Sequence, residues 1–524
     1  MSFAVVQSRA IAALTLLPVS VETDLANGLP QFSIVGLPDA AVREAKERVR
    51  SAILNSGFEF PQHRITVNLA PADLPKDSGR FDLAIAVAIL AASGQLDSPD
   101  LTFRLRRLIF VGELSLTGQL LPIRGAFAMA AGFVRHQVAE QSLVLPLENC
   151  AEASLIGSDH LRFAANLRQV VLHLKSLEPL LASQPMPPRP SAGVSLEDWS
   201  EIRGQESAKR AALVAASGHH NLLMLGPPGI GKSMIAARMA GLLPALSHAQ
   251  ACTLAAIQSI SGGIDVSGWQ KPPYRAPHHS ISSRAMIGGG QPLRPGEISL
   301  AHHGLLFLDE LPEFPRDALE SLREPLEKAE VSIARVRDRV TFPADIMLVA
   351  AMNPCPCGYF GVRWARRPCR CSPDRIMRYR SRISGPLMDR FDMVIQLETP
   401  SATDLSTSIE QDSAPAPTTQ SLAVLVDQAR QVQLRRQSCV NARLTPTELH
   451  QHARLGSAAE ALMLRAAGRW GWSARAWHRV LRVARTIADL EGASEIGLAH
   501  VAEAIESRRA IDIEPDLPGF EQAR

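Results

Sequence analysis

The spacing of apolar residues along the chain predicts different elements in different regions. Near the N-terminus, apolar residues as far as Val21 alternate as in a strand, and short apolar runs at 221–225, 304–308 and 346–351 are typical of buried parallel strands. Toward the C-terminus, apolar residues recur at helical spacings. These residues are Leu462, Leu464, Trp470, Trp472, Val480, Leu481, Val483 and Ile487. The pattern therefore predicts an α/β fold followed by a small helical bundle.

Two segments rich in loop-forming residues divide the chain. Prolines between 184 and 193 prevent a helix and favour an extended spacer, and the stretch 401–420 is rich in Ser, Thr, Ala and Pro. A chain of 524 residues is also too long for one hydrophobic core. We therefore expect three folded units joined by two linkers. The units cover 1–182, 195–400 and 421–524, and the linkers cover 183–194 and 401–420.

Composition and charge are those of an ordinary globular protein, with 46% hydrophobic residues, 20% charged residues and a formal net charge of +3. Because this charge is small, any nucleic-acid surface has to be local. The longest apolar run, at 83–92, is shorter than the roughly 20 residues that span a bilayer. The apolar stretch after Arg9 lacks a convincing signal-peptide cleavage site. We expect a cytoplasmic protein without a membrane segment.

A glycine-rich loop follows the predicted strand at 221–225 and precedes a predicted helix at 234–243. Its residues are Gly226, Pro227, Pro228, Gly229, Ile230, Gly231, Lys232 and Ser233. Strand, loop and helix in this order are the context of a phosphate-binding loop, whose backbone N–H groups surround phosphate oxygens. We expect Lys232 to bind the outer phosphates of ATP and Ser233 to coordinate Mg²⁺. This context argues against the alternative of a mere glycine-rich turn.

Two acids end the predicted strand at 304–308, and an amide follows the next strand. In a parallel sheet, Asp309 would lie beside the phosphate-binding loop and complete the magnesium shell. Glu310 would polarise the attacking water, with helix capping as its alternative role. Asn353 would orient that water, unless it is an ordinary turn residue before Pro354. The set predicts ATP hydrolysis rather than nucleotide binding alone.

Two arginines are candidates for stabilising the charge on the γ-phosphate. Arg390 lies in the segment 387–392, and such an arginine can act on the site of a neighbouring subunit. Arg475 stands at the start of a predicted C-terminal helix and would act from a lid over the nucleotide. A surface or ion-paired arginine is the alternative for each.

The glycine-rich loop and the acidic strand end are Walker A and B motifs, and with the amide and the arginines they resemble the AAA+ superfamily. Within that superfamily, they resemble the branch shared by magnesium chelatase ATPase subunits and the replicative MCM helicases. The segment 272–297, which contains His278 and His279, resembles the helix-2 insert of the chelatase-like family. The segment 331–340 resembles the pre-sensor hairpin that lines the pore of related motors. The resemblance implies an AAA+ P-loop ATPase core with a helical C-terminal lid, assembled as a ring, expected to be a hexamer.

The segment 331–340 carries Arg335, Arg337 and Arg339 at intervals of two residues. On a strand, this spacing puts three guanidinium groups on one face. Such a row suits the phosphate backbone of DNA, which attracts positive charge without base contacts. A solvated strand edge, protected from further pairing by its charges, is the alternative. We expect this row to contact single-stranded or branched DNA.

Four of the seven cysteines form two close pairs: Cys355 with Cys357, and Cys369 with Cys371. Four thiols at this spacing can close a tetrahedral zinc site, although the pairs are tighter than the commoner C-x₂-C. The segment 355–382 also carries eight arginines with interleaved aromatic residues, as a nucleic-acid contact requires. We expect Zn²⁺ here, with a reduced, metal-free loop as the alternative.

The N-terminal unit resembles the Lon-type protease domain through the segments 75–82 and 112–123. In that family, a serine after the first segment and a lysine after the second form the catalytic pair. Here the serine position falls on Arg80 and the lysine position on Phe127, while Ser78 comes two residues too early. We therefore expect a Lon-protease-like α/β domain without peptidase chemistry.

The combination of a degenerate Lon-like domain, a chelatase-like AAA+ core and a helical C-terminal domain resembles the bacterial ComM/YifB family. That resemblance implies DNA branch migration in natural transformation. We expect an ATP-driven, ring-shaped DNA motor with helicase activity. The alternative is a magnesium-chelatase-like subunit that remodels a protein or a porphyrin-metallation partner. The missing serine and lysine argue against an ATP-dependent protease.

Overall fold

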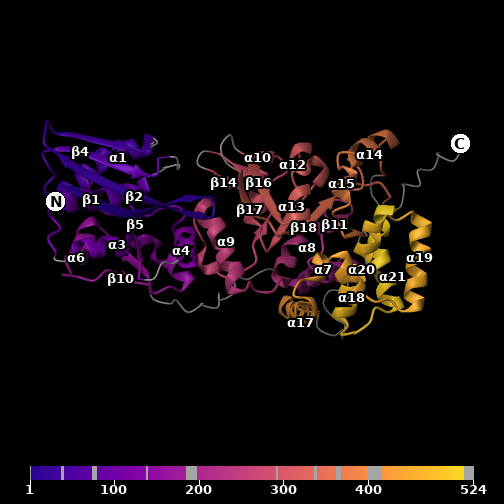
Figure 1. The fold of residues 1–524 in the computed structure, drawn as a ribbon. Helices are drawn as coiled ribbons and strands as arrows, with labels where there is room; N and C mark the ends of the chain where they lie inside the picture. Colours follow the sequence, from indigo (N-terminus) through magenta and orange to yellow (C-terminus); the bar gives the residue numbers. More distant parts are fainter. Residues whose placement is uncertain are drawn as a thin grey trace.

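The computed structural model describes the chain in segments separated by short gaps. They are residues 2–36, 40–72, 79–98, 100–136, 140–183, 198–290, 293–334, 339–361, 368–397 and 416–512. Figure 1 shows a sheet with helices at the N-terminal end, a second sheet with helices in the middle, and helices alone at the C-terminal end. This arrangement confirms the predicted α/β fold class with a helical C-terminal region.

The apolar alternation near the N-terminus predicted a strand, and the structure has a hairpin of two strands there, on which the N-terminal sheet is built. Strands β1 (Phe3–Ala12) and β2 (Thr15–Ala26) pair antiparallel along the whole of β1, with Val6 opposite Val21 and both fully buried. The sheet order is β10-β9-β8-β5-β1-β2-β4-β3. The other strands are β3 (Gln31–Val35), β4 (Arg64–Ala70), β5 (Leu108–Phe110), β8 (Ser142–Pro146), β9 (Leu161–Ala164) and β10 (Leu181–Ala182).

Helix α2 (Asp82–Ala92) is the centre of the N-terminal unit, and all its residues are buried. Its first residue, Asp82, accepts hydrogen bonds of 2.8 and 3.2 Å from the guanidinium of Arg48 in α1 (Ala40–Asn55). Among the described helices, none combines the length and apolar character needed to cross a bilayer. The other elements are α3 (Leu101–Arg107), β6 (Glu113–Leu114), β7 (Leu120–Leu121), α4 (Ala126–Arg135), α5 (Cys150–Ala153) and α6 (Leu167–Leu174).

The second sheet is parallel and confirms the three strands predicted from apolar runs. Its strands are β11 (Leu222–Leu225), β12 (Tyr274–Arg275), β15 (Leu305–Leu308), β18 (Met347–Met352) and β19 (Met393–Gln396). The order is β12-β15-β18-β11-β19, so β18 lies between the strand of the glycine-rich loop and the strand of the two acids. The carboxyl ends of β11, β15 and β18 therefore meet at one edge.

Buried side chains cover both faces of this sheet, which explains its uninterrupted apolar strands. One core contains Leu222 and Val349, and the core on the opposite face contains Leu223 and Leu348. The helices of this region are α7 (Glu206–Gly218), α8 (Lys232–Met239), α9 (His248–Ser261), α10 (Ser283–Ile287), α11 (Glu297–Leu300), α12 (Arg316–Glu320), α13 (Arg323–Lys328), α14 (Pro373–Arg380) and α15 (Gly385–Met388). A two-stranded pair, β13 (Gly288–Gly289) with β14 (Arg294–Pro295), lies in the segment that resembles the helix-2 insert.

The predicted hairpin is present as β16 (Glu330–Ala334) and β17 (Arg339–Pro343), which pair antiparallel. Ala334 lies opposite Arg339, so the chain reverses between them. That Arg335, Arg337 and Arg339 share one face of a strand stays a prediction, because only Arg339 belongs to the described residues. Arg339 is exposed at the start of β17, and Arg335 and Arg337 lie outside the described residues.

The C-terminal region is helical, as predicted, and packs against the second sheet. Val480 and Ile487 belong to the same buried core as Leu222 of β11. Leu464 departs from the predicted apolar pattern, because 59% of its surface is exposed. The helices are α17 (Thr419–Gln437), α18 (Pro446–His452), α19 (Ser457–Trp470), α20 (Ala474–Leu490) and α21 (Leu498–Asp512).

The N-terminal unit contacts the middle region where α4 meets α9. The backbone N–H of Gly125 donates to the carbonyl of Ser259 at 3.0 Å, and the N–H of Phe127 donates to the Ser259 hydroxyl at 3.2 Å. The side chain of Phe127 is fully buried, and its ring centre lies 6.0 Å from that of Trp269. A residue of α9 thus satisfies backbone N–H groups at the start of α4, which no turn of α4 itself can satisfy.

Candidate nucleotide-binding site

The glycine-rich loop joins the end of β11 to the start of α8, as the sequence predicted. Gly231 precedes α8 with a φ of 93°, a left-handed conformation that favours glycine. At Gly226, a Cβ would lie 3.1 Å from Cβ of Leu397 and 3.2 Å from its carbonyl oxygen, so the loop passes close to the residue that follows β19. The unpaired N–H groups of the first turn of α8 stand at the end of this loop, in the arrangement that binds phosphate.

Three oxygens surround the ammonium group of Lys232. It donates to the carbonyls of Gly226 at 2.6 Å and Pro227 at 2.9 Å, and to Oδ1 of Asn353 at 3.0 Å. Burial lowers the pKa of Lys232 below its ordinary value. Asn353 stands directly after β18, so the amide predicted to orient water is also in contact with the lysine of the loop.

Ser233 and Asp309 are in contact, as residues that share one magnesium ion would be. The hydroxyl of Ser233 donates to Oδ2 of Asp309 at 2.5 Å, and the backbone N–H of Glu310 donates to Oδ1 of Asp309 at 2.9 Å. The carboxylate of Asp309 therefore reaches from the end of β15 to the start of α8. A hydroxyl and a carboxylate are oxygen donors of the kind Mg²⁺ prefers, so the pair fits this ion.

Glu310 has a neighbour that the sequence did not mark as a site residue. Its Oε2 lies 3.3 Å from Nδ1 of His279, whose ring centre is 4.0 Å from that of His278. The two histidines follow β12, which pairs with β15 in the sheet. The contact depends on that pairing of distant segments, so the only signal in the sequence is the position of the histidines just after a strand.

The predicted side chains line one cavity of about 360 Å³. The structure brings together the loop, both acids and the amide, while Gly226, Pro227 and Ile230 belong to the loop without lining the cavity. The lining residues are Pro228, Gly229, Gly231, Lys232, Ser233, Met234, Asp309, Glu310, Met352 and Asn353.

The two predicted arginines lie away from this lining. Nη2 of Arg390 lies 2.5 Å from Oε2 of Glu327 in α13, and 15% of the Arg390 side chain is exposed. Arg475 is exposed in the first turn of α20. The roles of both arginines at the γ-phosphate stay predictions, and that of Arg390 requires a second subunit.

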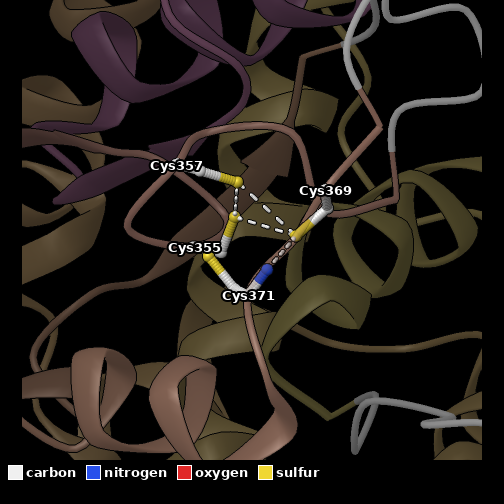
Figure 2. A group of neighbouring side chains, drawn as sticks. All are labelled: Cys355, Cys357, Cys369 and Cys371. Carbon is white, nitrogen blue, oxygen red and sulfur yellow. Dashed lines mark hydrogen bonds between the residues drawn. The ribbon is translucent and has the colours of Figure 1, made fainter.

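The four cysteines of the two pairs converge, and Figure 2 shows their sulfur atoms facing one another. Sγ of Cys355 lies 3.3 Å from that of Cys357 and 3.6 Å from that of Cys369, and the latter two are 3.5 Å apart. With Cys371, the four atoms lie within 4.8 Å of one another. Zinc bound by four thiolates at about 2.3 Å sets sulfur–sulfur edges of about 3.8 Å, so the group fits a tetrahedral site.

The positions that hold the peptidase pair in Lon-type domains have other surroundings here. Arg80 is buried immediately before α2, and Phe127 is buried in the contact with α9. Neither side chain offers the nucleophile or the base of such a pair. Ser78 lies outside the described residues.

Three regions of the chain match families of one enzyme subunit. Residues 198–405 match the family described as magnesium chelatase, subunit ChlI, and residues 416–508 match the family of its C-terminal part. Residues 21–149 match the family described as subunit ChlI of Mg-chelatase. The matches therefore include part of the N-terminal sheet, the second sheet and most of the C-terminal helical region.

Relatives align over nearly the whole chain. The chain is 43% identical over 513 residues to the YifB protein of Salmonella typhimurium, and 43% identical over 517 residues to competence protein ComM of Haemophilus influenzae. Both alignments cover 98% of each chain. A partial match, 26% identical over 180 residues, covers 34% of this chain and 23% of the "Probable DNA helicase MCM9" of Arabidopsis thaliana. This chain therefore belongs to the ComM/YifB family of magnesium-chelatase-like AAA+ ATPases.

Proposed function

We propose that this protein is an ATP-driven, ring-shaped motor that moves DNA strands in the cytoplasm, with branch migration in natural transformation as its role. The observation that carries the proposal is the cavity where Lys232, Ser233, Asp309, Glu310 and Asn353 meet. These are the groups that phosphate binding, metal binding and water activation require in a P-loop ATPase. The competence name of the Haemophilus relative and the helicase name of the Arabidopsis protein direct the proposal to DNA.

In this proposal, each side chain of the cavity has one task in hydrolysis. Backbone N–H groups of the loop and of α8 bind the phosphate oxygens, and Lys232 exchanges its carbonyl partners for them. Ser233 and Asp309 would hold Mg²⁺, and this ion would supply positive charge beside the phosphates. Glu310 polarises the attacking water, and Asn353 orients it.

The hairpin of β16 and β17 is the proposed DNA contact, and it lies close to the cavity along the chain. It carries the exposed Arg339 and directly precedes β18, the strand that ends at Asn353. A force on the hairpin therefore reaches the nucleotide through one strand. Arg335 and Arg337 add charge that attracts the phosphate backbone without selecting a sequence.

Two further parts complete the proposed motor. Subunits assemble as a ring, expected to be a hexamer, in which Arg390 completes the site of a neighbour, and Arg475 acts from the helical lid. The four cysteines bind Zn²⁺ in a closed structural site, since four protein ligands leave no position for a substrate.

A second function is favoured by the family names. All three matching families are those of magnesium chelatase, an assignment that fits a subunit remodelling a protein or a porphyrin-metallation partner. The two functions share the same ATP site and differ in the effector that stimulates it.

The test compares ATP hydrolysis without DNA and with single-stranded DNA, duplex DNA and a four-way junction. We expect single-stranded or branched DNA to stimulate hydrolysis, because the proposed motor couples turnover to DNA in its pore. A rate unchanged by every DNA would contradict the DNA motor and favour the chelatase-like function.

A combined Arg335→Ala, Arg337→Ala and Arg339→Ala variant tests the contact itself. Its basal hydrolysis should equal that of the parent, whereas DNA stimulation should be lost. The slope of log affinity against log salt should flatten by up to roughly 2 units, at about 0.7 per phosphate for single strands. A control variant removes equal charge from exposed arginines elsewhere and should keep the slope. These control residues are Arg64, Arg168 and Arg454.

A further inference from the structure

We propose that the cysteine group, defined as Cys355, Cys357, Cys369 and Cys371, holds the phosphate-binding loop in shape, so that bound metal raises the affinity for nucleotide. The inference rests on the proposed nucleotide site and is independent of whether DNA is the substrate. It gives the metal site a task in ATP binding, carried by two contacts between the cysteine group and the loop.

The first contact follows from chain connectivity. Oδ1 of Asn353 accepts a hydrogen bond from the ammonium of Lys232 at 3.0 Å. A single residue, Pro354, separates Asn353 from Cys355, which has no exposed surface. A shift of the cysteine group therefore moves the amide that holds the lysine of the loop.

The second contact is made through space by Gly358. Its N–H donates to the carbonyl of Cys355 at 2.9 Å, which closes a turn around Cys357. A Cβ on Gly358 would lie 2.6 Å from Cδ of Pro228 and 3.1 Å from its Cγ. Such distances leave no room for a side chain, so the backbone of this turn rests directly on the phosphate-binding loop.

The second pair of cysteines is tied to the same place. Cys371 lies just before α14, and the last residue of that helix, Arg380, donates to the carbonyl of Pro354 at 3.3 Å. The guanidinium of Arg380 also lies 5.7 Å from the ring centre of Phe360. Both pairs are therefore connected to the residues next to Asn353.

A metal ion bound by the cysteine group would fix the positions of the chain segments that make these contacts. The four sulfur atoms come from two chain segments and lie within 4.8 Å of one another, so one ion cross-links both segments. The free energy of binding a structural metal is available for ordering the chain around it. A loop that is already ordered binds its ligand at a lower entropic cost. Loss of metal should therefore weaken nucleotide binding before it affects the chemistry.

The most specific test is the variant Gly358→Ala, which leaves the four cysteines in place and disturbs the contact between Gly358 and Pro228. In Gly358→Ala the new methyl group collides with Pro228, whereas in Gly361→Ala it meets nothing within 4 Å. Both glycines have positive φ, +86° and +77°, so the backbone strain of the two variants is matched.

The readout is titration of the DNA-free protein with mant-ATP, together with zinc content. We expect Gly358→Ala to raise the dissociation constant about tenfold, because small displacements of a binding loop have effects of this size or larger. Gly361→Ala should bind like the parent, and both variants should retain zinc. Equal affinities for Gly358→Ala and Gly361→Ala would overturn the proposal.

Metal removal is tested separately with Cys369→Ser combined with Cys371→Ser, which leaves Cys355 beside Pro354 intact. With reducing agent present throughout, zinc should fall from about one equivalent per chain to none, and the dissociation constant for mant-ATP should again rise about tenfold. A parent without zinc, or a zinc-free variant with the parent's affinity, would contradict the inference. Failure of the proposed DNA motor would appear independently, as hydrolysis that DNA does not stimulate.

Discussion

The oxygens around Lys232 compete with the phosphates that this lysine is expected to bind. Its ammonium donates to two carbonyls of its own loop and to Asn353. A hydrogen bond from a charged donor contributes about 1.5 to 3 kcal/mol, so a nucleotide must offer contacts at least as strong. Phosphate oxygens carry full charge and do so. When Lys232 turns to phosphate, it gives up the two carbonyls of its own loop, and Asn353 stays beside the cavity, where it can orient water.

The first prediction separates binding from chemistry at this site. Lys232→Ala should abolish nucleotide binding, because it removes the positive charge that faces the outer phosphates. Glu310→Gln should bind ATP as the parent does but hydrolyse it about 10²- to 10⁴-fold more slowly, the usual contribution of a general base. Binding is measured by mant-ATP titration and turnover by phosphate release.

Glu313→Gln is the matched control, since this acid lies three residues further on and pairs with Arg382 instead of lining the cavity. Its turnover should equal that of the parent. Parent-like turnover in Glu310→Gln would remove Glu310 from the mechanism.

Residues of the cavity differed in how far the sequence could predict them. The loop from Gly226 to Ser233 and both acids were predicted because each depends on a local strand, loop or strand end. His279 was missed as a partner of Glu310, because their contact exists only when β12 pairs with β15. The contact between Asn353 and Lys232 was missed for the same reason, since it joins the end of β18 to the start of α8.

At the scale of elements, apolar runs predicted strands correctly where both faces of the strand are buried. The runs that became β11, β15 and β18 are buried along nearly their whole length. Period-two spacing continues unchanged through a turn, so the spacing of the arginines in the segment 331–340 does not by itself place all three on one strand. The contact between α4 and α9 could not be predicted from the sequence either, since the sequence shows that Phe127 is apolar but not which distant residues it packs against.

The second prediction concerns this contact between α4 and α9. Phe127→Ala should lower stability by about 3 kcal/mol, the cost of truncating a buried phenylalanine. Part of that cost belongs to the aromatic pair with Trp269, so a double-mutant cycle with Trp269→Leu should show a coupling of about 1 kcal/mol. Denaturant unfolding followed by circular dichroism provides the four free energies.

Phe133→Ala is the control for this cycle. Phe133 lies on the same helix and is also buried, but it packs in the core of the N-terminal unit. Its stability loss should be similar, and its coupling to Trp269 should be close to zero. Equal coupling of Phe127 and Phe133 to Trp269 would show that the contact does not depend on the aromatic pair.

For the whole molecule, the question is which chain supplies a second positive charge to the cavity. Within the described residues, Lys232 is the only cationic side chain that lines it. An added arginine typically accelerates hydrolysis by about 10³- to 10⁵-fold in such enzymes. Arg390 is held by Glu327, and its backbone carbonyl accepts a hydrogen bond from Asn221, the residue before β11. A head-to-tail ring would offer this arginine to the next subunit, because every subunit then presents the same surface to its neighbour.

The last prediction tests that arrangement by mixing two inactive variants. Arg390→Ala keeps an intact cavity but gives its neighbour no arginine, whereas Lys232→Ala has a dead cavity but still offers Arg390. If the arginine acts between subunits, the cavity of an Arg390→Ala subunit receives Arg390 from a Lys232→Ala neighbour and can hydrolyse ATP. In an equal, random mixture about a quarter of the interfaces have this order, so hydrolysis should recover toward a quarter of the parent rate.

Mixing Arg390→Ala with the double variant Lys232→Ala and Arg390→Ala should recover nothing, because no subunit then offers the arginine. Recovery in neither mixture, at concentrations where subunits exchange, would place the action of Arg390 within its own chain.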